Sequence, residues 1–179
     1  MFNNIPSELR KLKQWVCWNS FKMPINPKLE WISPASVTNP DTWGSFEQAL
    51  EACKRFNASG IGFVFTKDDS FVGIDIDGCR NPNNGKIEAE AMIIAREMRS
   101  YTEVSPSGKG LHIIVKGWLP FRGKQGDVFE IYGYGRYFTM TGWHYEPTPI
   151  IVKERSKELK KLIEKYFPDI VIMKPLWNK

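Results

Sequence analysis

Cysteine and histidine are scarce in this sequence, and long apolar runs are missing. Its 179 residues include three cysteines, widely separated along the chain, and two histidines. So small and scattered a set indicates neither a disulfide framework nor a zinc site. No stretch approaches the roughly 18 apolar residues that a membrane-spanning helix needs. The N-terminus also lacks the basic start and apolar core of a signal peptide, so we expect a cytoplasmic protein without a membrane partner.

The net charge and the aromatic content exclude few classes of function. The net charge is +5 and the sequence pI is about 9.1, which fits a polyanionic partner without requiring one. Seven Trp, six Tyr and eleven Phe can supply rings that stack on unpaired bases, although most of them are expected in the core. The function therefore has to be sought in particular motifs.

The pattern of apolar residues predicts an α+β protein with a largely antiparallel or mixed sheet. A capping box of Ser45 and Gln48 opens one of the expected helices. The stretch 22–43, rich in Pro and Asn, is predicted to be mostly loop or short irregular strand. Helices are expected at residues 6–13, 45–57, 87–99 and 154–166. Strands are expected at residues 14–19, 61–65, 71–75, 101–104, 111–116, 128–132 and 137–141.

Two acidic residues end the apolar stretch 71–77, Phe-Val-Gly-Ile-Asp-Ile-Asp. Alternate residues of a strand share a face, so Asp75 and Asp77 should emerge side by side. Two carboxylates at such a short distance repel each other unless a cation lies between them. The pair therefore predicts an Mg²⁺ or Mn²⁺ site with phosphate as another ligand. The alternative is a strand that runs into an acidic turn. An EF-hand is excluded, because Arg80 and Lys86 occupy the positions where that loop needs Gly and Glu.

The second motif is the segment 105–112, Ser-Pro-Ser-Gly-Lys-Gly-Leu-His. Its glycines let the backbone approach an anion, and consecutive N–H groups of such a turn can bind phosphate. Ser107 adds a hydroxyl, Lys109 a positive charge and His112 an imidazole. The segment is not a P-loop, because no glycine stands five residues before Gly108 and Gly follows Lys109. The alternative is a glycine-rich hairpin with an incidental histidine.

The third motif is the segment 130–142, which begins Glu-Ile-Tyr and continues Gly-Tyr-Gly-Arg-Tyr-Phe-Thr-Met-Thr-Gly. Glu130 has apolar neighbours on both sides and should face away from them. It can be a third metal ligand if its strand neighbours that of Asp75. Arg136 can pair bidentately with a phosphate. The alternatives are a solvent-facing Glu130 and a structural salt bridge of Arg136.

Taken in this order, the three motifs resemble the archaeo-eukaryotic primase superfamily, and most closely the primase-polymerase domains of phage and plasmid replication proteins. The resemblance covers roughly residues 10–145. It implies a two-layer catalytic core with an RRM-like mixed or antiparallel sheet flanked by helices. The catalytic domain would span residues 1–150, followed by a C-terminal helix and tail, 151–179. That segment would either lead into a missing helical or helicase region or end a stand-alone core. Further segments that fit the same domains are 14–16, 22–27, 42–46 and 60–64.

The resemblance also implies the chemistry of DNA replication in a bacterial host. A nucleoside monophosphate would pass from a dNTP or NTP to a 3′-hydroxyl on single-stranded DNA, with a replicative helicase as a further partner. Extension of an existing primer is expected rather than initiation. Two Mg²⁺ or Mn²⁺ ions would be held by Asp75, Asp77 and Glu130, which with His112 are the expected catalytic residues. The nucleotide would be bound by Ser107, Gly108, Lys109, His112, Arg136 and Lys22.

Two other functions are compatible with the same residues. A metal-dependent nuclease or phosphotransferase would use the same carboxylates, although the 105–112 loop favours a triphosphate substrate. A non-catalytic single-strand-binding module would keep the fold without turnover. Clustered carboxylates count against such a module, because they repel the phosphates of a nucleic acid.

Overall fold

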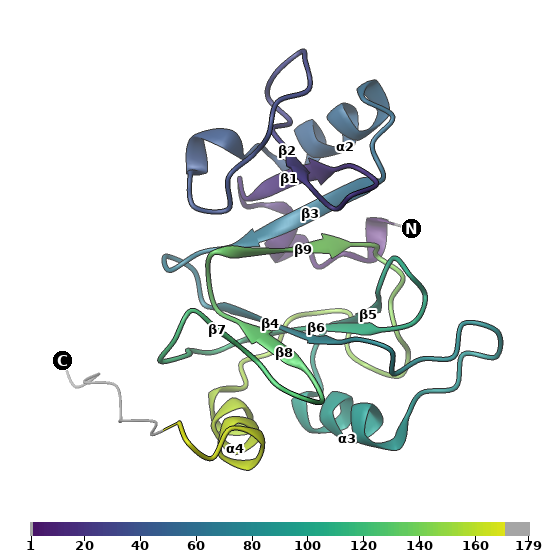
Figure 1. Ribbon diagram of the computed structural model, residues 1–179, viewed down its shortest axis with the longest axis vertical. Coiled ribbons are helices and arrows are strands. Elements are labelled where there is room, and N and C mark those ends of the chain that lie inside the picture. The colour runs from purple at the N-terminus through teal and green to yellow at the C-terminus, as the bar shows by residue number, and fades with distance from the viewer. Residues whose placement is uncertain (1, 171–179) are drawn as a thin grey trace.

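Two antiparallel sheets packed against each other form the centre of the computed structural model, which describes residues 2–170 (Figure 1). Every ladder between their strands is antiparallel, which confirms the predicted α+β class. Sheet A contains, in spatial order, β2 (Pro24–Ile25), β1 (Trp15–Trp18), β3 (Gly60–Phe65) and β9 (Arg136–Met140). Sheet B contains β5 (Thr102–Val104), β6 (Leu111–Lys116), β4 (Phe71–Ile76), β8 (Glu130–Tyr132) and β7 (Gly123–Gln125).

Helices α3 (Ala89–Met98) and α4 (Ser156–Tyr166) cover the side of sheet B that faces away from sheet A (Figure 1). Helix α2 (Phe46–Arg55) packs on the same face of sheet A as sheet B does, because Phe46, Phe63 and Phe71 belong to one buried cluster. Leu159 and Leu162 of α4 join Ile94 of α3 and Ile74 of β4 in one buried cluster on the helical side of sheet B. A second cluster, which includes Phe46 of α2, fills the space between the sheets and beneath α2. No helix within residues 2–170 is long and apolar enough to cross a membrane. The helices are α1 (Ser7–Arg10), α2 (Phe46–Arg55), α3 (Ala89–Met98) and α4 (Ser156–Tyr166), with short 3₁₀ turns at Phe2–Asn4 and Pro40–Thr42.

Strand β4 directs its two faces to different surroundings. Val72, Ile74 and Ile76 pack on the helical side, whereas the residues between them face sheet A. Gly73 marks the close approach of the two sheets, because a Cβ there would lie 2.6 Å from the ring of Phe138 on β9. The next residue on this face of β4, Asp75, therefore lies where the two sheets separate.

The predicted elements agree with the structure apart from their ends and one strand. The capping box is confirmed, with Ser45 and Gln48 each accepting a hydrogen bond from the other's backbone N–H. Helix α1 is shorter than the predicted 6–13. Strand β7 was not predicted, because Gly-Lys-Gln lacks any strand-favouring residue and is extended only through its pairing with β8. Of the predicted tail, residues 171–179 lie outside the described part of the chain.

Candidate active site

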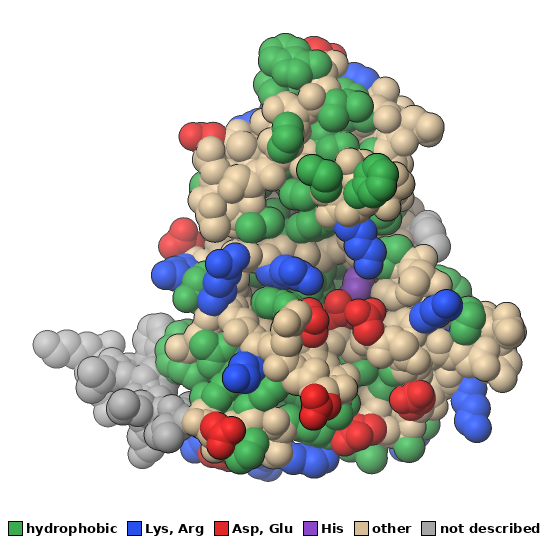
Figure 2. Space-filling view, in the orientation of Figure 1, with side chains coloured by type: hydrophobic (Ala, Val, Ile, Leu, Met, Phe, Trp, Pro, Cys, Tyr) green, Lys and Arg blue, Asp and Glu red, His purple; other side chains and the backbone are tan. Residues whose placement is uncertain are grey.

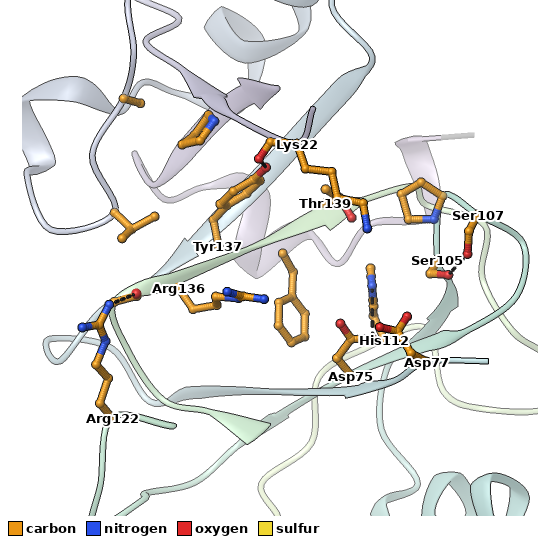
Figure 3. Close-up of a pocket in the computed structure, with 16 residues that line it drawn as sticks. Lys22, Asp75, Asp77, Ser105, Ser107, His112, Arg122, Arg136, Tyr137 and Thr139 are labelled. Carbon is orange, nitrogen blue, oxygen red and sulfur yellow. Dashed lines mark hydrogen bonds and ion pairs between the residues drawn. The ribbon is translucent and has the colours of Figure 1, made fainter. Parts of the chain in front are cut away.

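A cavity of about 510 Å³ lies between β9 of sheet A and strands β4 and β6 of sheet B. We call it the cleft. Figure 2 shows its mouth, where acidic side chains face lysine and arginine side chains with a histidine between them. All three sequence motifs contribute to its walls (Figure 3). The predicted residues that line it are Lys22, Asp75, Asp77, Ser107, His112 and Arg136, whereas Gly108, Lys109 and Glu130 do not.

Asp75 supplies a buried carboxylate at the bottom of the cleft. Its side chain is 18% exposed, and its Oδ1 atom has no hydrogen-bond partner within the described residues. Burial raises the pKa of Asp75; the charge of His112 opposes this, and the charges of Asp77 and Glu130 add to it. Asp77, in the turn directly after β4, is exposed and lines the same cavity. The charged carboxylate of Asp75 is thus unfavourably placed unless a further cation joins it.

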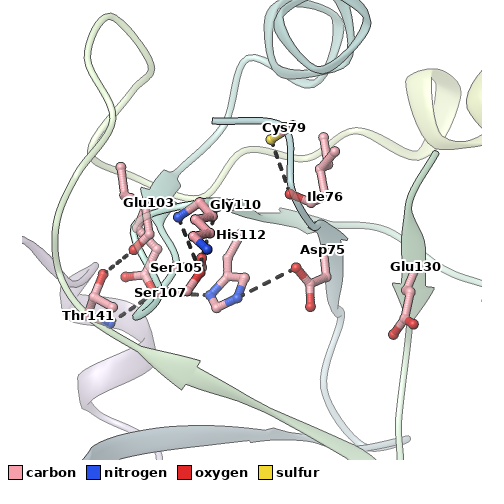
Figure 4. A network of polar contacts seen from close by, with 12 residues as sticks. Asp75, Ile76, Cys79, Glu103, Ser105, Ser107, Gly110, His112, Glu130 and Thr141 are labelled. Carbon is pink, nitrogen blue, oxygen red and sulfur yellow. Dashed lines mark hydrogen bonds and ion pairs between the residues drawn. The ribbon is translucent and has the colours of Figure 1, made fainter. Parts of the chain in front are cut away.

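His112 is the buried imidazole of the cleft. It lies opposite Asp75 in the β4–β6 ladder, with its Nε2 atom 3.7 Å from Asp75 Oδ1 (Figure 4). Its Nδ1 atom lies 3.4 Å from a carboxylate oxygen of Glu103. Burial lowers the pKa of His112, but the hydrogen bond to Glu103 and the charges of Asp75, Glu103 and Asp77 raise this pKa above its ordinary value overall. A positively charged imidazole suits an anionic ligand.

Glu103 on β5 is a site residue that the sequence did not reveal. Its side chain is fully buried, and its Oε2 atom accepts hydrogen bonds from the hydroxyl of Tyr101 (2.7 Å) and the N–H of Gly142 (2.9 Å). Its Oε1 atom accepts one from the N–H of Thr141 (3.0 Å) and contacts His112. Glu103 therefore joins β5, the end of β9 and the catalytic histidine candidate. The one available signal was a charged residue within a short, otherwise uncharged strand.

The glycine-rich loop, which joins β5 to β6, folds into a tight turn that lies beside the end of β4. Ser105 closes this turn with two hydrogen bonds. Its carbonyl oxygen accepts one from the N–H of Gly108 (2.9 Å), and its hydroxyl oxygen accepts one from the N–H of Gly110 (3.1 Å). A Cβ at Gly110 would lie 2.8 Å from the carbonyl oxygen of Ile76, so only glycine allows this approach. The turn places the Ser107 hydroxyl, 3.1 Å from that of Ser105, in the cleft, while Lys109 is exposed outside it.

The opposite wall comes from β9 and the loop after β1. The hydroxyl of Tyr137 donates a hydrogen bond of 2.5 Å to the carbonyl oxygen of Lys22, which joins that loop to β9. Tyr137, Thr139 and Arg122 also line the cleft and were not predicted as site residues. Tyr137 and Thr139 belong to the third motif, in which only Glu130 and Arg136 were singled out. Arg122 lies outside the motifs, directly before the unpredicted strand β7.

Glu130 lies on the strand next to Asp75, as its predicted role requires (Figure 4). Its carboxylate accepts hydrogen bonds from Gln125 (2.6 Å) and the Tyr132 hydroxyl (2.8 Å), and lies 3.6 Å from the guanidinium of Arg136. No three His, Cys, Asp or Glu side chains in residues 2–170 are gathered closely enough to hold a metal ion. Glu130 as a third metal ligand therefore stays a prediction.

The carboxylate pair by itself fits Mg²⁺ or Mn²⁺. Proteins usually bind Mg²⁺ through one or two carboxylates, and phosphate and water complete its shell. Asp75 and Asp77 supply two such groups, and the Oδ1 atom of Asp75, which accepts no hydrogen bond within residues 2–170, is the kind of oxygen that such an ion binds. The donor set of the cleft thus suits an ion that arrives with a phosphorylated substrate.

Comparison with known proteins agrees with this reading of the motifs. No protein-family model matches the chain. A protein named DNA primase-polymerase, from Nitratiruptor phage NrS-1, is 40% identical to it over 154 residues, which cover 79% of this chain. The chain spans only 21% of the length of that relative. The similarity confirms the predicted resemblance to primase-polymerases.

Proposed function

Because this chain is a homologue of part of a phage DNA primase-polymerase, we propose that its cleft carries out template-directed nucleotidyl transfer in DNA replication. A nucleoside monophosphate would pass from an incoming dNTP or NTP to the 3′-hydroxyl of a strand paired with single-stranded DNA. One observation carries the proposal: the pair Asp75 and Asp77 shares a single cavity with the imidazole of His112 and the hydroxyl of Ser107. A carboxylate pair facing cationic and hydroxyl groups matches a metal-bound triphosphate.

In this proposal Asp75 and Asp77 hold two Mg²⁺ or Mn²⁺ ions, with Glu130 as the third carboxylate. Bound there, the ions would lower the pKa of the attacking hydroxyl and neutralise charge on the leaving pyrophosphate. The neighbouring Arg136 would leave the Glu130 carboxylate, now 3.6 Å away, and contact phosphate or sugar.

The remaining side chains bind and orient the triphosphate. The imidazolium of His112 faces the phosphates, the hydroxyl of Ser107 donates to them, and Lys22 adds a charge from the opposite wall. Glu103 keeps His112 in place from behind. Phosphoryl transfer depends mainly on positioning and charge stabilisation, so no activated protein nucleophile is needed. Extension of an existing primer is the activity that we propose, and a replicative helicase is the proposed partner.

A primer-extension assay tests this function. Wild-type protein, supplied with Mg²⁺ or Mn²⁺ and dNTPs or NTPs, should lengthen a labelled primer on single-stranded DNA. Asp75→Ala/Asp77→Ala should remove the activity, because the variant lacks the proposed metal ligands. Asp41→Ala/Asp127→Ala is the matched control, since it removes two exposed carboxylates that lie outside the cleft.

Each alternative function has its own outcome in the same assay. A labelled strand that becomes shorter with metal would replace the proposal with a nuclease. Binding of the strand without any change in its length, by folded wild-type protein, would leave only a binding module. Products on an unprimed template would add initiation to extension.

A further inference from the structure

A groove leads away from the cleft on the side opposite the glycine-rich loop. Arg122 and Gly135 line both the cleft and an adjoining hollow of about 350 Å³, which also includes Lys67 and Tyr134. Lys67 and Tyr134 in turn line a further hollow of about 350 Å³ that reaches Trp118. Because they share these lining residues, the two hollows lie next to each other in a row that begins at the cleft, and we call this row the groove. The steps proposed above assign it no role.

Two positive charges stand on this groove without an acidic partner. None of the ion pairs in residues 2–170 involves Lys67 or Arg122, and both side chains are exposed. Asp69 nearby is already engaged, since its carboxylate accepts hydrogen bonds from Gln14 and Thr66. Asp68 is the one carboxylate on the wall of the first hollow. Figure 2 shows the lysine and arginine side chains gathered at this edge of the cleft.

One of the two cations lies over an aromatic ring, and the other is held by a backbone carbonyl. The ammonium group of Lys67 lies 4.6 Å from the centre of the Tyr134 ring. The guanidinium of Arg122 donates a hydrogen bond to the carbonyl oxygen of Gly135 (2.5 Å). A Cβ at Gly135 would lie 2.6 Å from Arg122 Nε, and the φ of +66° at this residue also favours glycine. The backbone thus fixes Arg122 at the junction of cleft and groove.

We propose that the single-stranded DNA template lies in this groove, with its phosphates on Lys67 and Arg122 and a base against Tyr134. Single strands are bound by a positively charged groove together with aromatic rings on which bases stack. The groove meets the cleft at Arg122, whereas the proposed triphosphate site lies at the Ser107 end. The template and the incoming nucleotide therefore approach from opposite sides. This inference rests on the proposed function, because it assigns a place to that reaction's template.

Another basic surface competes for the same role. Arg80 stacks over the exposed ring of Trp143 (4.8 Å to the ring centre) and lines a separate hollow with Lys86 and Lys109. This hollow has no lining residue in common with the cleft. A strand bound there would not be led to the carboxylates, so the groove at Arg122 is favoured.

Equilibrium binding of a fluorescein-labelled oligodeoxythymidine of about 16 nucleotides tests the inference by anisotropy at several salt concentrations. Lys67→Ala/Arg122→Ala should weaken binding about tenfold at low salt. It should also reduce the slope of log K against log salt by about 1.4, since each lost phosphate contact on a single strand contributes about 0.7. Tyr134→Ala should weaken binding about tenfold, the effect of losing one stacked base, and leave the slope unchanged.

The control removes the same charge elsewhere. Lys54→Ala/Lys161→Ala deletes exposed lysines of α2 and α4 and should bind as the wild type does. The inference would be overturned if folded Lys67→Ala/Arg122→Ala bound DNA with the affinity and salt slope of the wild type. It would also be overturned if only Arg80→Ala/Lys86→Ala lost affinity for DNA. The assay contains neither nucleotide nor metal. If the groove substitutions weaken binding but the wild-type protein extends no primer, the inference about the groove is upheld and the proposed function is refuted. If the wild-type protein extends primers but the groove substitutions leave binding unchanged, the proposed function is upheld and the inference is refuted.

Discussion

Asp75→Asn is expected to abolish nucleotide incorporation and, in the absence of metal, to make the folded protein more stable. The two effects have one cause, the buried carboxylate of Asp75. In the folded chain its Oδ1 atom has no hydrogen-bond partner among the described residues, and burial raises its pKa. A carboxylic acid whose pKa is raised by folding destabilises the folded state at a pH above its folded-state pKa, because it is then charged. Asparagine has nearly the same shape and removes that charge.

The expected sizes are large enough to measure separately. Incorporation should fall about 10³-fold, the loss typical of removing one group that stabilises the transition state. The Tm in EDTA should rise by about 3 °C, the shift that about 1 kcal/mol produces in a protein of this size. The stability gain should disappear at acidic pH, below the ordinary pKa of an aspartic acid, because Asp75 is then protonated in both the folded and the unfolded states. Primer extension and thermal unfolding monitored by circular dichroism supply both values.

Asp127→Asn is the matched control, because Asp127 is exposed and lies outside the cleft. It should change neither activity nor Tm. An Asp75→Asn variant that still extends primers would refute its role as a metal ligand. A Tm in EDTA below that of the wild type would show instead that the carboxylate supports the fold.

Glu103→Ala is expected to be the most damaging single substitution for stability. The fully buried carboxylate accepts hydrogen bonds from Tyr101, Thr141 and Gly142, and all three donors would lose their acceptor. Breaking a buried charged network of this kind typically costs about 3–5 kcal/mol. Denaturant unfolding should show that loss. Tyr101→Phe removes one donor only and should cost about 1 kcal/mol.

Glu103→Gln separates stability from the positioning of His112. The amide retains one oxygen acceptor, so this variant should fold at 25 °C, yet its NH₂ group no longer attracts the imidazolium of His112. We expect a rise in the KM for nucleotide that exceeds any loss of folded protein. An unchanged KM in folded Glu103→Gln would limit Glu103 to a structural role.

The sequence predicted those parts of the site that depend on local geometry. Strand alternation placed Asp75 and Asp77 on one face, and the glycine spacing of residues 105–110 predicted the turn that presents Ser107. The strand with Glu130 does lie beside that of Asp75, as its proposed role required. The first two features are set within a few residues of chain, where periodicity and turn chemistry are strong signals. The pairing of the Glu130 strand with the Asp75 strand is a long-range contact, which the sequence could state only as a condition.

Features that depend on contacts distant in the sequence could not be predicted. Glu103 binds N–H groups 38 and 39 residues away, and nothing in its strand announces them. One of the hydrogen bonds that hold the Glu130 carboxylate comes from Gln125 on β7, a strand created by pairing alone. Arg122 enters the groove only because that strand turns the chain back toward Gly135. Tertiary packing decides all three.

A crystal structure with Mn²⁺ and a non-hydrolysable deoxynucleoside triphosphate is the most direct test of the central claim, that the cleft binds a metal-bound triphosphate. The anomalous scattering of manganese locates the ion independently of the protein map. We expect manganese at the carboxylates of Asp75 and Asp77 and the triphosphate against Ser107 and His112. Manganese or triphosphate bound outside the cleft, with Asp75 and Asp77 free of metal, would contradict the account.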